Sequence, residues 1–220
     1  FAVIYYTMRR KLLFVALGIA TLIGIIWAIP STRYLINTIK YRDPGIYDRD
    51  IFASAVVNAS ETEFDLPTGT GFGKTVPDTL LTAMAGYETT AFLVVKDSTY
   101  IFERYFLDGD QDSVSNSFSA AKSIVGILVG AAIYDGKIKS VDDPISNYIV
   151  EFKNKDVGTV TIKELLTMSS GIQWDEAYTS LFGPTTKAYY GTNLEGQMLT
   201  LSLKTEPGKV FEYQSCNTQL

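Results

Sequence analysis

An uncharged apolar stretch lies near the N-terminus, and apolar and polar residues are interspersed along the rest of the chain. Leu12 to Ile29 is a run of eighteen residues without a charge, and Met8-Arg9-Arg10-Lys11 precedes it. A run of this length just reaches the thickness of the hydrocarbon core of a bilayer, and a basic flank before it favours a cytoplasmic N-terminus. We predict a basic flank over 1–11 and a transmembrane signal-anchor over 12–29. A cleaved signal peptide and a buried core helix are the alternatives.

Residues 30–78 contain turn and loop chemistry and predict a connector to a main domain over 79–220. Two runs rich in aromatic and β-branched residues, 91–95 and 99–106, follow with a polar turn between them. Such a pair predicts an antiparallel hairpin.

Small and aliphatic residues prevail from Ser119 to Tyr134, and Gly136 follows as a stop signal. A helix that is apolar nearly all round is expected to be buried. Gly126 and Gly130, four residues apart, would let another element approach it closely.

Two shorter helices are predicted further on. Asp142-Asp143-Pro144 predicts a short helix with the proline at its first position. Thr161-x-x-Glu164 is a capping box, which predicts a helix that runs through Met168 and ends before Gly171.

Charge is unevenly distributed along the chain. Residues 1–42 contain six basic residues and no acidic one, whereas the remainder has 13 basic and 24 acidic residues. A predominantly acidic domain argues against nucleic acid as a partner, because binding to phosphates needs a basic face. The chain has no histidine and one cysteine, Cys216, so it lacks the usual ligand set of a zinc site, and no metal or cofactor is expected.

Ser119-x-x-Lys122 is the pattern with the most chemical content. A serine attacks a carbonyl only if a base takes its proton, and a Ser-His-Asp triad cannot be built from these residues because histidine is absent. A lysine one helical turn away can serve instead. The spacing alone also fits a helix-capping serine followed by a solvated lysine.

Seven segments, in order from Ala91 to Leu220, resemble the serine β-lactamase-related hydrolases of the class C type. That group also includes esterases, D-amino-acid peptidases and 6-aminohexanoate-oligomer hydrolases. The segments are Phe92-Leu-Val-Val-Lys96, Ile101-Phe-Glu-Arg-Tyr105, Ser117-Phe-Ser-Ala-Ala-Lys-Ser123, Asp135-Gly-Lys-Ile138, Val141-Asp-Asp-Pro-Ile145, Thr161-Ile-Lys-Glu-Leu-Leu-Thr-Met-Ser-Ser-Gly171 and Phe211-Glu-Tyr-Gln-Ser215.

The resemblance implies roles for individual residues. Ser119 would be the acylated nucleophile, Lys122 its proton partner, and Tyr213 the family's tyrosine that shuttles the proton to the leaving group. The family commonly has Tyr-x-Asn here, with an asparagine that binds the substrate, whereas this chain has Ser215 at that place. Asn217 lies two residues further on and also fits a Ser-x-Asn element, so both Ser215 and Asn217 are candidates for substrate binding.

The family's third element, Lys-Thr-Gly or His-x-Gly, does not occur between Tyr213 and Leu220. We therefore expect the chain to be C-terminally truncated, to carry only the N-terminal part of the domain, and to fold poorly or be inactive alone. The implied fold is α/β of the α+β type, β-lactamase/transpeptidase-like, with an incomplete antiparallel sheet beside helices.

The resulting hypothesis is a membrane-anchored serine hydrolase with an extracytoplasmic domain. It would act on an ester, amide or β-lactam-like bond of a small-molecule or peptide-like substrate. A penicillin-recognising sensor or a peptidoglycan-binding domain that acylates without turnover is the alternative.

Overall fold

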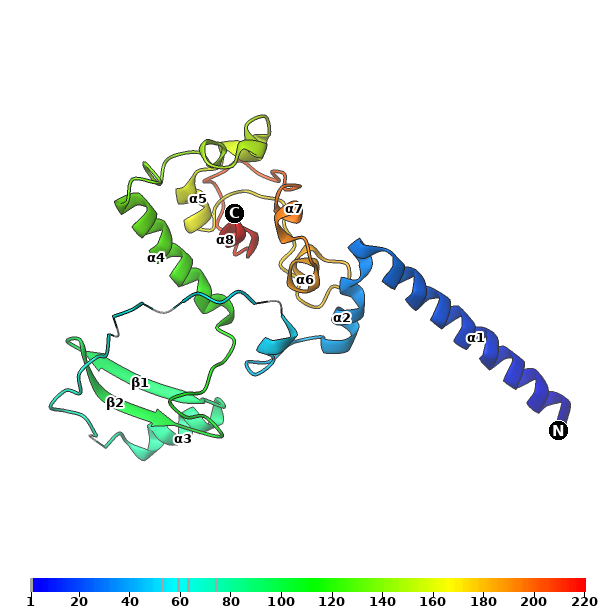
Figure 1. The fold of residues 1–220 in the computed structure, drawn as a ribbon, viewed down its shortest axis with the longest axis horizontal. Coiled ribbons are helices and arrows are strands. Elements are labelled where there is room, and N and C mark those ends of the chain that lie inside the picture. The colour runs from blue at the N-terminus through cyan, green and yellow to red at the C-terminus, as the bar shows by residue number, and fades with distance from the viewer. Residues whose placement is uncertain (1, 53, 59, 63, 74) are drawn as a thin grey trace. The chain divides into compact units, whose positions relative to one another are not determined.

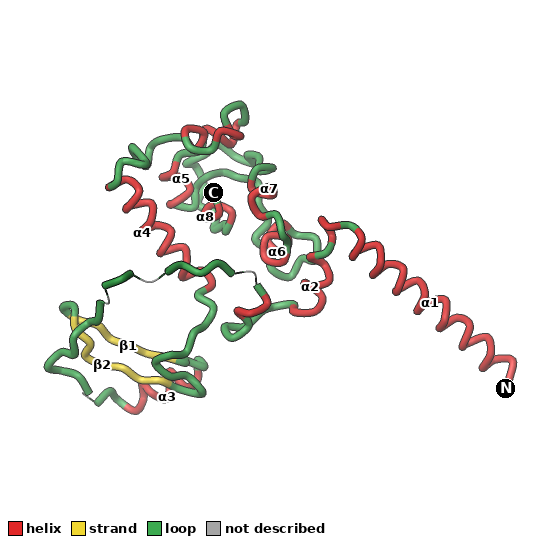
Figure 2. The backbone as a smooth tube through the Cα atoms, viewed as in Figure 1, coloured by secondary structure: helices red, strands yellow, loops and turns green. Residues whose placement is uncertain are grey.

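The computed structural model describes residues 2–52, 54–58, 60–62, 64–73 and 75–220 (Figures 1 and 2). They divide into two compact units: 49–116 forms one, and residues up to 48 together with 117–220 form the other. The α-helices and strands are α1 (Ala2–Ala28), α2 (Tyr34–Tyr41), α3 (Asp78–Gly86), β1 (Ala91–Lys96), β2 (Thr99–Tyr105), α4 (Ala121–Tyr134), α5 (Ile162–Leu166), α6 (Pro184–Tyr190), α7 (Leu194–Met198) and α8 (Cys216–Gln219). The 3₁₀ helices are η1 (Pro30–Thr32), η2 (Arg49–Ile51), η3 (Phe118–Ala120), η4 (Ile145–Asn147), η5 (Val150–Phe152) and η6 (Asp156–Thr159).

Helix α1 is the long blue helix of Figure 1. Its stretch Met8–Ala28 has a mean hydropathy of 2.2 and no buried residue, so it is long and apolar enough to cross a membrane. A signal sequence near the N-terminus has the same properties. After the helix, Arg33 donates from Nε to the carbonyl of Trp27 at 2.7 Å, and its guanidinium lies over the Trp27 ring.

The predicted hairpin is confirmed as the antiparallel pair β1 and β2, drawn in yellow in Figure 2. Asp97 and Ser98 connect the strands, and both have left-handed backbones, with φ of +51° and +58°. Two left-handed residues in succession are the mark of a type I′ turn, whose twist matches that of the strands. The register shifts by one residue after Val94, where a bulge interrupts the ladder.

The hydrophobic core of the unit that contains 117–220 is built from residues between 145 and 216. Phe152 and Ile172 are fully buried at its centre. Its other buried members are Ile145, Val157, Val160, Ile162, Leu165, Trp174, Met198, Leu201 and Cys216. Short helices and loops supply nearly all of these side chains, so the core depends on contacts between segments distant in sequence.

The capping box at α5 is confirmed. The Glu164 backbone N–H donates to the Thr161 hydroxyl at 3.2 Å, and the Thr161 N–H donates to the Glu164 carboxylate at 2.8 Å. The helix ends at Leu166, earlier than predicted, because Met168 takes a left-handed backbone with φ of +54°.

The helix predicted after Asp142-Asp143-Pro144 is the short 3₁₀ helix η4. Pro144 lies just before its first residue and has an extended backbone, with ψ of 145°, so the prediction that proline occupies the first helical position is wrong. The Asp143 carboxylate accepts from the Tyr148 hydroxyl at 2.5 Å instead of capping the helix.

The prediction that the helix following Ser119 is buried is also wrong. No residue of α4 is buried, and Ile127 is 68% exposed. Val129 packs against the core, so one side of the helix is partly covered. An apolar sequence makes burial favourable, but burial also needs a facing surface, and the described residues supply one along that side only.

Candidate active site

Ser119 and Lys122 meet at the start of α4. The 3₁₀ turn η3 carries Ser119 and leads directly into the helix, which places Lys122 one turn further on. The Lys122 Nζ donates to the Ser119 Oγ at 3.3 Å. Ser119 is exposed, so its hydroxyl is both accessible and paired with a cation.

The backbone just before Ser119 is strained. Phe118 has φ of +42°, in the left-handed region that a bulky L-residue rarely adopts. A residue in such a conformation costs on the order of 1–3 kcal/mol and persists only where its surroundings hold it. The strain therefore lies one residue before Ser119, the nucleophile predicted from the sequence.

Tyr213 is brought to the same place from the far end of the chain. The Lys122 Nζ lies 5.2 Å from the centroid of the Tyr213 ring, in a cation–π arrangement. Tyr213 is 42% exposed. One ammonium group thus contacts both a serine hydroxyl and a tyrosine ring, so the three residues selected from the sequence lie together.

A hub around Glu176, which sequence analysis did not find, holds the residues next to Tyr213. The Ser215 backbone N–H and hydroxyl donate to the two Glu176 carboxylate oxygens at 2.7 and 2.6 Å. The same carboxylate accepts from the Trp174 indole at 2.9 Å and from the Tyr178 hydroxyl at 2.6 Å. Charge-assisted bonds of this kind are among the strong ones in proteins.

Gln214 fixes the other side of the same loop. It is 2% exposed, and its amide donates to the Ile172 carbonyl at 3.1 Å. Tyr213 is therefore followed by two anchored residues, Gln214 and Ser215. Ser215 is the one member of this hub that the sequence had singled out, as the residue that stands where the family has asparagine.

Asn217 is largely buried, although it lines the groove that begins at Lys122. It is 5% exposed, its carboxamide oxygen accepts from the Ser170 hydroxyl at 2.6 Å, and its nitrogen lies 3.5 Å from the Met168 sulfur. Its polar atoms thus contact the loop that follows α5. Of the two candidates for substrate binding, Ser215 is engaged by Glu176 and Asn217 by this loop.

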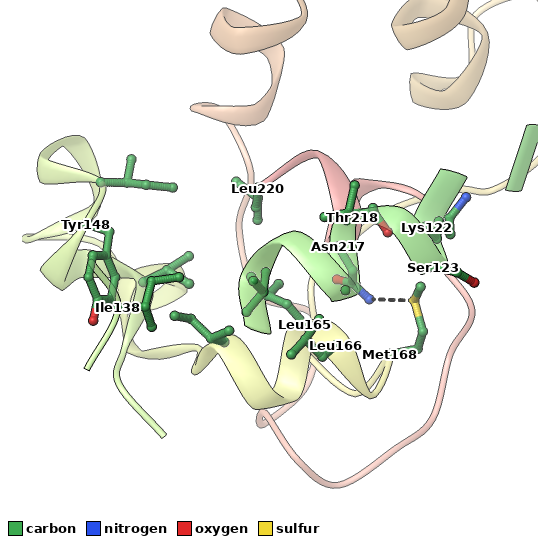
Figure 3. Close-up of a pocket in the computed structure, with 16 residues that line it drawn as sticks. Lys122, Ser123, Ile138, Tyr148, Leu165, Leu166, Met168, Asn217, Thr218 and Leu220 are labelled. Atoms are coloured by element: carbon green, nitrogen blue, oxygen red, sulfur yellow. Dashed lines mark hydrogen bonds between the residues drawn. The ribbon is translucent and has the colours of Figure 1, made fainter. Parts of the chain in front are cut away.

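Two cavities flank the serine–lysine pair. A groove of about 410 Å³ has Lys122 at one end and apolar side chains, including Ile138 and Leu165, along its length (Figure 3). A smaller pocket of about 200 Å³ has Ser119 in its wall, together with several tyrosines. We call this smaller cavity the tyrosine pocket.

Neither a metal site nor a reactive thiol is found in the part of the chain that the structure describes. No group of three or more histidine, cysteine, aspartate or glutamate side chains there could hold a metal ion. Cys216 is fully buried, and burial, followed by the negative charge of Glu176, raises the pKa of its thiol to about 12. A thiol that stays protonated is a poor nucleophile.

An exposed serine hydroxyl, an adjacent lysine and a nearby tyrosine thus lie together at the start of a helix in a mixed fold. The sequence profile of the Beta-lactamase family matches residues 78–220, and the chain belongs to this family. Members of this family are serine hydrolases that act on amide or ester bonds.

Two relatives are similar to parts of the chain. A 6-aminohexanoate-dimer hydrolase of Paenarthrobacter ureafaciens is 30% identical over 90 residues, which are 41% of this chain and 23% of the relative. A solved structure from Bacillus anthracis, provisionally named a 6-aminohexanoate-dimer hydrolase, shares the fold with a TM-score of 0.55 and 20% identity. That similarity covers 71% of this chain and 46% of the other, so the matched regions span less than half of either relative.

Proposed function

We propose that this protein is a serine hydrolase that forms an acyl-enzyme on Ser119. The observation that carries the proposal is the contact of the Lys122 ammonium with both the Ser119 hydroxyl, at 3.3 Å, and the Tyr213 ring. A lysine and a tyrosine side by side can share one proton and act together as the base that a histidine supplies elsewhere. Family membership over residues 78–220 supports the same chemistry.

The proposed reaction has two half-reactions. The Ser119 Oγ bonds to the substrate carbonyl carbon while its proton passes to the Tyr213–Lys122 pair. The tetrahedral intermediate collapses, the carbon–oxygen or carbon–nitrogen bond breaks, and the pair returns the proton to the leaving alcohol or amine. Water then attacks the acyl carbon, the pair takes its proton, and Ser119 recovers a proton as the acid leaves.

We also propose a cellular arrangement and a domain layout. Residues 12–29 would anchor the chain in a membrane, and residues 79–220 would belong to an extracytoplasmic hydrolase domain. Residues 30–78 would connect the anchor to that domain. The uncharged part of α1 from residue 12 onward, and the basic residues Arg9, Arg10 and Lys11 just before it in the same helix, support this orientation.

Labelling by a fluorophosphonate tests the nucleophile and the base. The Ser119 Oγ would displace fluoride from phosphorus, and mass spectrometry would locate the adduct. We expect Ser119→Ala to abolish labelling, Tyr213→Phe to slow it about a hundredfold or more, and Ser215→Ala to leave it within a fewfold of the parent rate. Unchanged labelling of Ser119→Ala would refute the proposal. If only Ser215→Ala abolished acylation, the assignment of Tyr213 as base would be wrong.

Product release separates the hydrolase from the penicillin-recognising sensor. With a p-nitrophenyl ester, a hydrolase would release more than one equivalent of p-nitrophenol per Ser119 in a continuing phase, and robust turnover by this chain would also contradict the expectation that it is inactive alone. A sensor would stop at one equivalent. Ser119→Ala is the matched control for background hydrolysis.

A further inference from the structure

The segment that follows α1 forms one wall of the tyrosine pocket. Arg42, Asp43 and Pro44 line this cavity together with residues from 118–190, among them Ser119 and Tyr189. These three residues lie outside the region 78–220 that matches the family. The pocket is therefore assembled partly from sequence that family membership does not describe.

Specific contacts hold this wall in place. Helix α2 packs against α6, where the Tyr41 and Tyr190 rings stack with centroids 6.4 Å apart and planes 17° apart. The Tyr190 hydroxyl donates to the Arg42 carbonyl at 3.1 Å, across 148 residues of sequence. Burial, and then the negative charges of Asp43 and Asp48, raise the pKa of Tyr190, so its hydroxyl keeps the proton that this bond needs.

The hydroxyls in the pocket are already used by the protein. Thr185 donates to the Asp175 carbonyl at 2.7 Å, and Thr186 donates to the Ser180 carbonyl at 2.7 Å. Tyr178 donates to Glu176 at 2.6 Å. With these donors occupied, much of what the wall offers a ligand is aromatic and aliphatic surface.

The volume of the tyrosine pocket and the charges on its wall restrict the kind of ligand it can hold. A cavity of about 200 Å³ is below the range of drug-sized pockets, which begins near ~300 Å³. It corresponds to roughly six or seven water volumes, enough for a chain of about four to six carbons. Arg42 and Asp43 are neighbours of opposite charge, so the wall carries no net charge that would select an ionic group.

We propose that the tyrosine pocket holds a short, uncharged, apolar group of the substrate beside Ser119, and that the Arg42–Pro44 wall sets the chain length it accepts. This inference rests on the proposed function and names its substrate class. Short-chain neutral esters or amides should react better than those with very small or long chains.

The test uses the full chain in lipid nanodiscs and three alkyl fluorophosphonates, with methyl, butyl and octyl groups. In each reaction the Ser119 oxygen bonds to phosphorus, the phosphorus–fluorine bond breaks, and the serine proton passes to the base. We expect the butyl compound to label Ser119 at least about tenfold faster than the methyl compound, because each buried methylene adds to binding. The octyl compound should be slower than the butyl compound.

Tyr41 does not line the pocket, but its ring stacks on Tyr190 and so holds the wall. The substitution Tyr41→Ala removes this stacking. We expect it to lower the butyl-to-methyl rate ratio about tenfold, while continued reaction with the methyl compound reports that Ser119 is still assembled. Tyr190→Phe, which removes only the hydroxyl bonded to Arg42, should lower the ratio less. Tyr47→Ala, in the same segment but 59% exposed, is the matched control and should keep the parent ratio.

The outcomes separate this inference from the proposed function. If Ser119 is labelled but the rate does not depend on chain length, or Tyr41→Ala keeps the parent ratio, the inference is overturned and the nucleophile assignment stands. If no compound labels Ser119 in the parent chain, the proposed function falls, and the inference falls with it.

Discussion

Helix α4 and the region from Val141 to Leu220 are both rich in apolar residues, yet they differ in how far these residues are buried. Phe152 and Ile172, in the later region, are fully buried, whereas Ile127 of α4 is 68% exposed. The later region folds back on itself through many short elements, and α4 is a single rod that meets neighbours along one side. Apolar content therefore decides what can be buried, and the arrangement of other segments decides what is.

The largest expected difference between the two regions concerns truncation of a large side chain. Phe152→Ala should lower the free energy of unfolding by about 3–5 kcal/mol, because it leaves a cavity in a packed core. Ile127→Ala should cost less than about 1 kcal/mol, because that side chain already faces solvent. Denaturant unfolding followed by the fluorescence of the buried Trp174 would measure both. Equal costs would show that α4 is buried in solution and would remove the contrast.

Glycine-to-alanine substitutions should change stability in opposite directions in the two regions. Gly171 has φ of +69°, and a Cβ there would lie 2.4 Å from the Thr205 carbonyl oxygen, so Gly171→Ala should cost roughly 1–3 kcal/mol. At Gly130, inside α4, nothing lies within 4 Å of such a Cβ. Gly130→Ala should therefore raise stability by about 0.5–1 kcal/mol. Thermal unfolding of the two variants gives the sign directly, and a destabilised Gly130→Ala would reveal a close neighbour on α4.

A further expected effect is a pH dependence that comes from the core. The pKa of Cys216 is raised to about 12 in the folded chain from an ordinary value of 9.0. Above pH 9 the unfolded chain loses this proton and the folded chain keeps it, so stability is full below pH 9 and falls as pH rises toward 12. The slope from this group is up to about 1.4 kcal/mol per pH unit.

Cys216→Ala isolates this contribution, because other titrating groups are common to both chains. Urea midpoints at pH 8, 9 and 10 should fall more steeply for the parent than for the variant. Parallel slopes would mean that the thiol is accessible to solvent.

Several features could be predicted from the sequence because they depend on neighbouring residues. The hairpin needs only two strand-forming runs and a turn, and the capping box needs only Thr161 and Glu164 three residues apart. The Ser119–Lys122 contact likewise follows from one turn of backbone. Tyr213 could be placed only through the resemblance to a family, since nothing in its own surroundings distinguishes it from other tyrosines.

Other features arise from contacts across long stretches of chain. The Glu176 hub joins residues 39 apart, and the bond from Tyr190 to Arg42 spans 148 residues. No local pattern marks either end of such a contact, because its formation depends on how all the intervening segments pack. The sequence by itself determined the spanning-length helix, the hairpin and the serine–lysine pair, where short-range sterics and hydrogen bonds suffice. Tertiary structure alone decided that α4 stays exposed, that Glu176 anchors Ser215, and that the segment after α1 closes the pocket at Ser119.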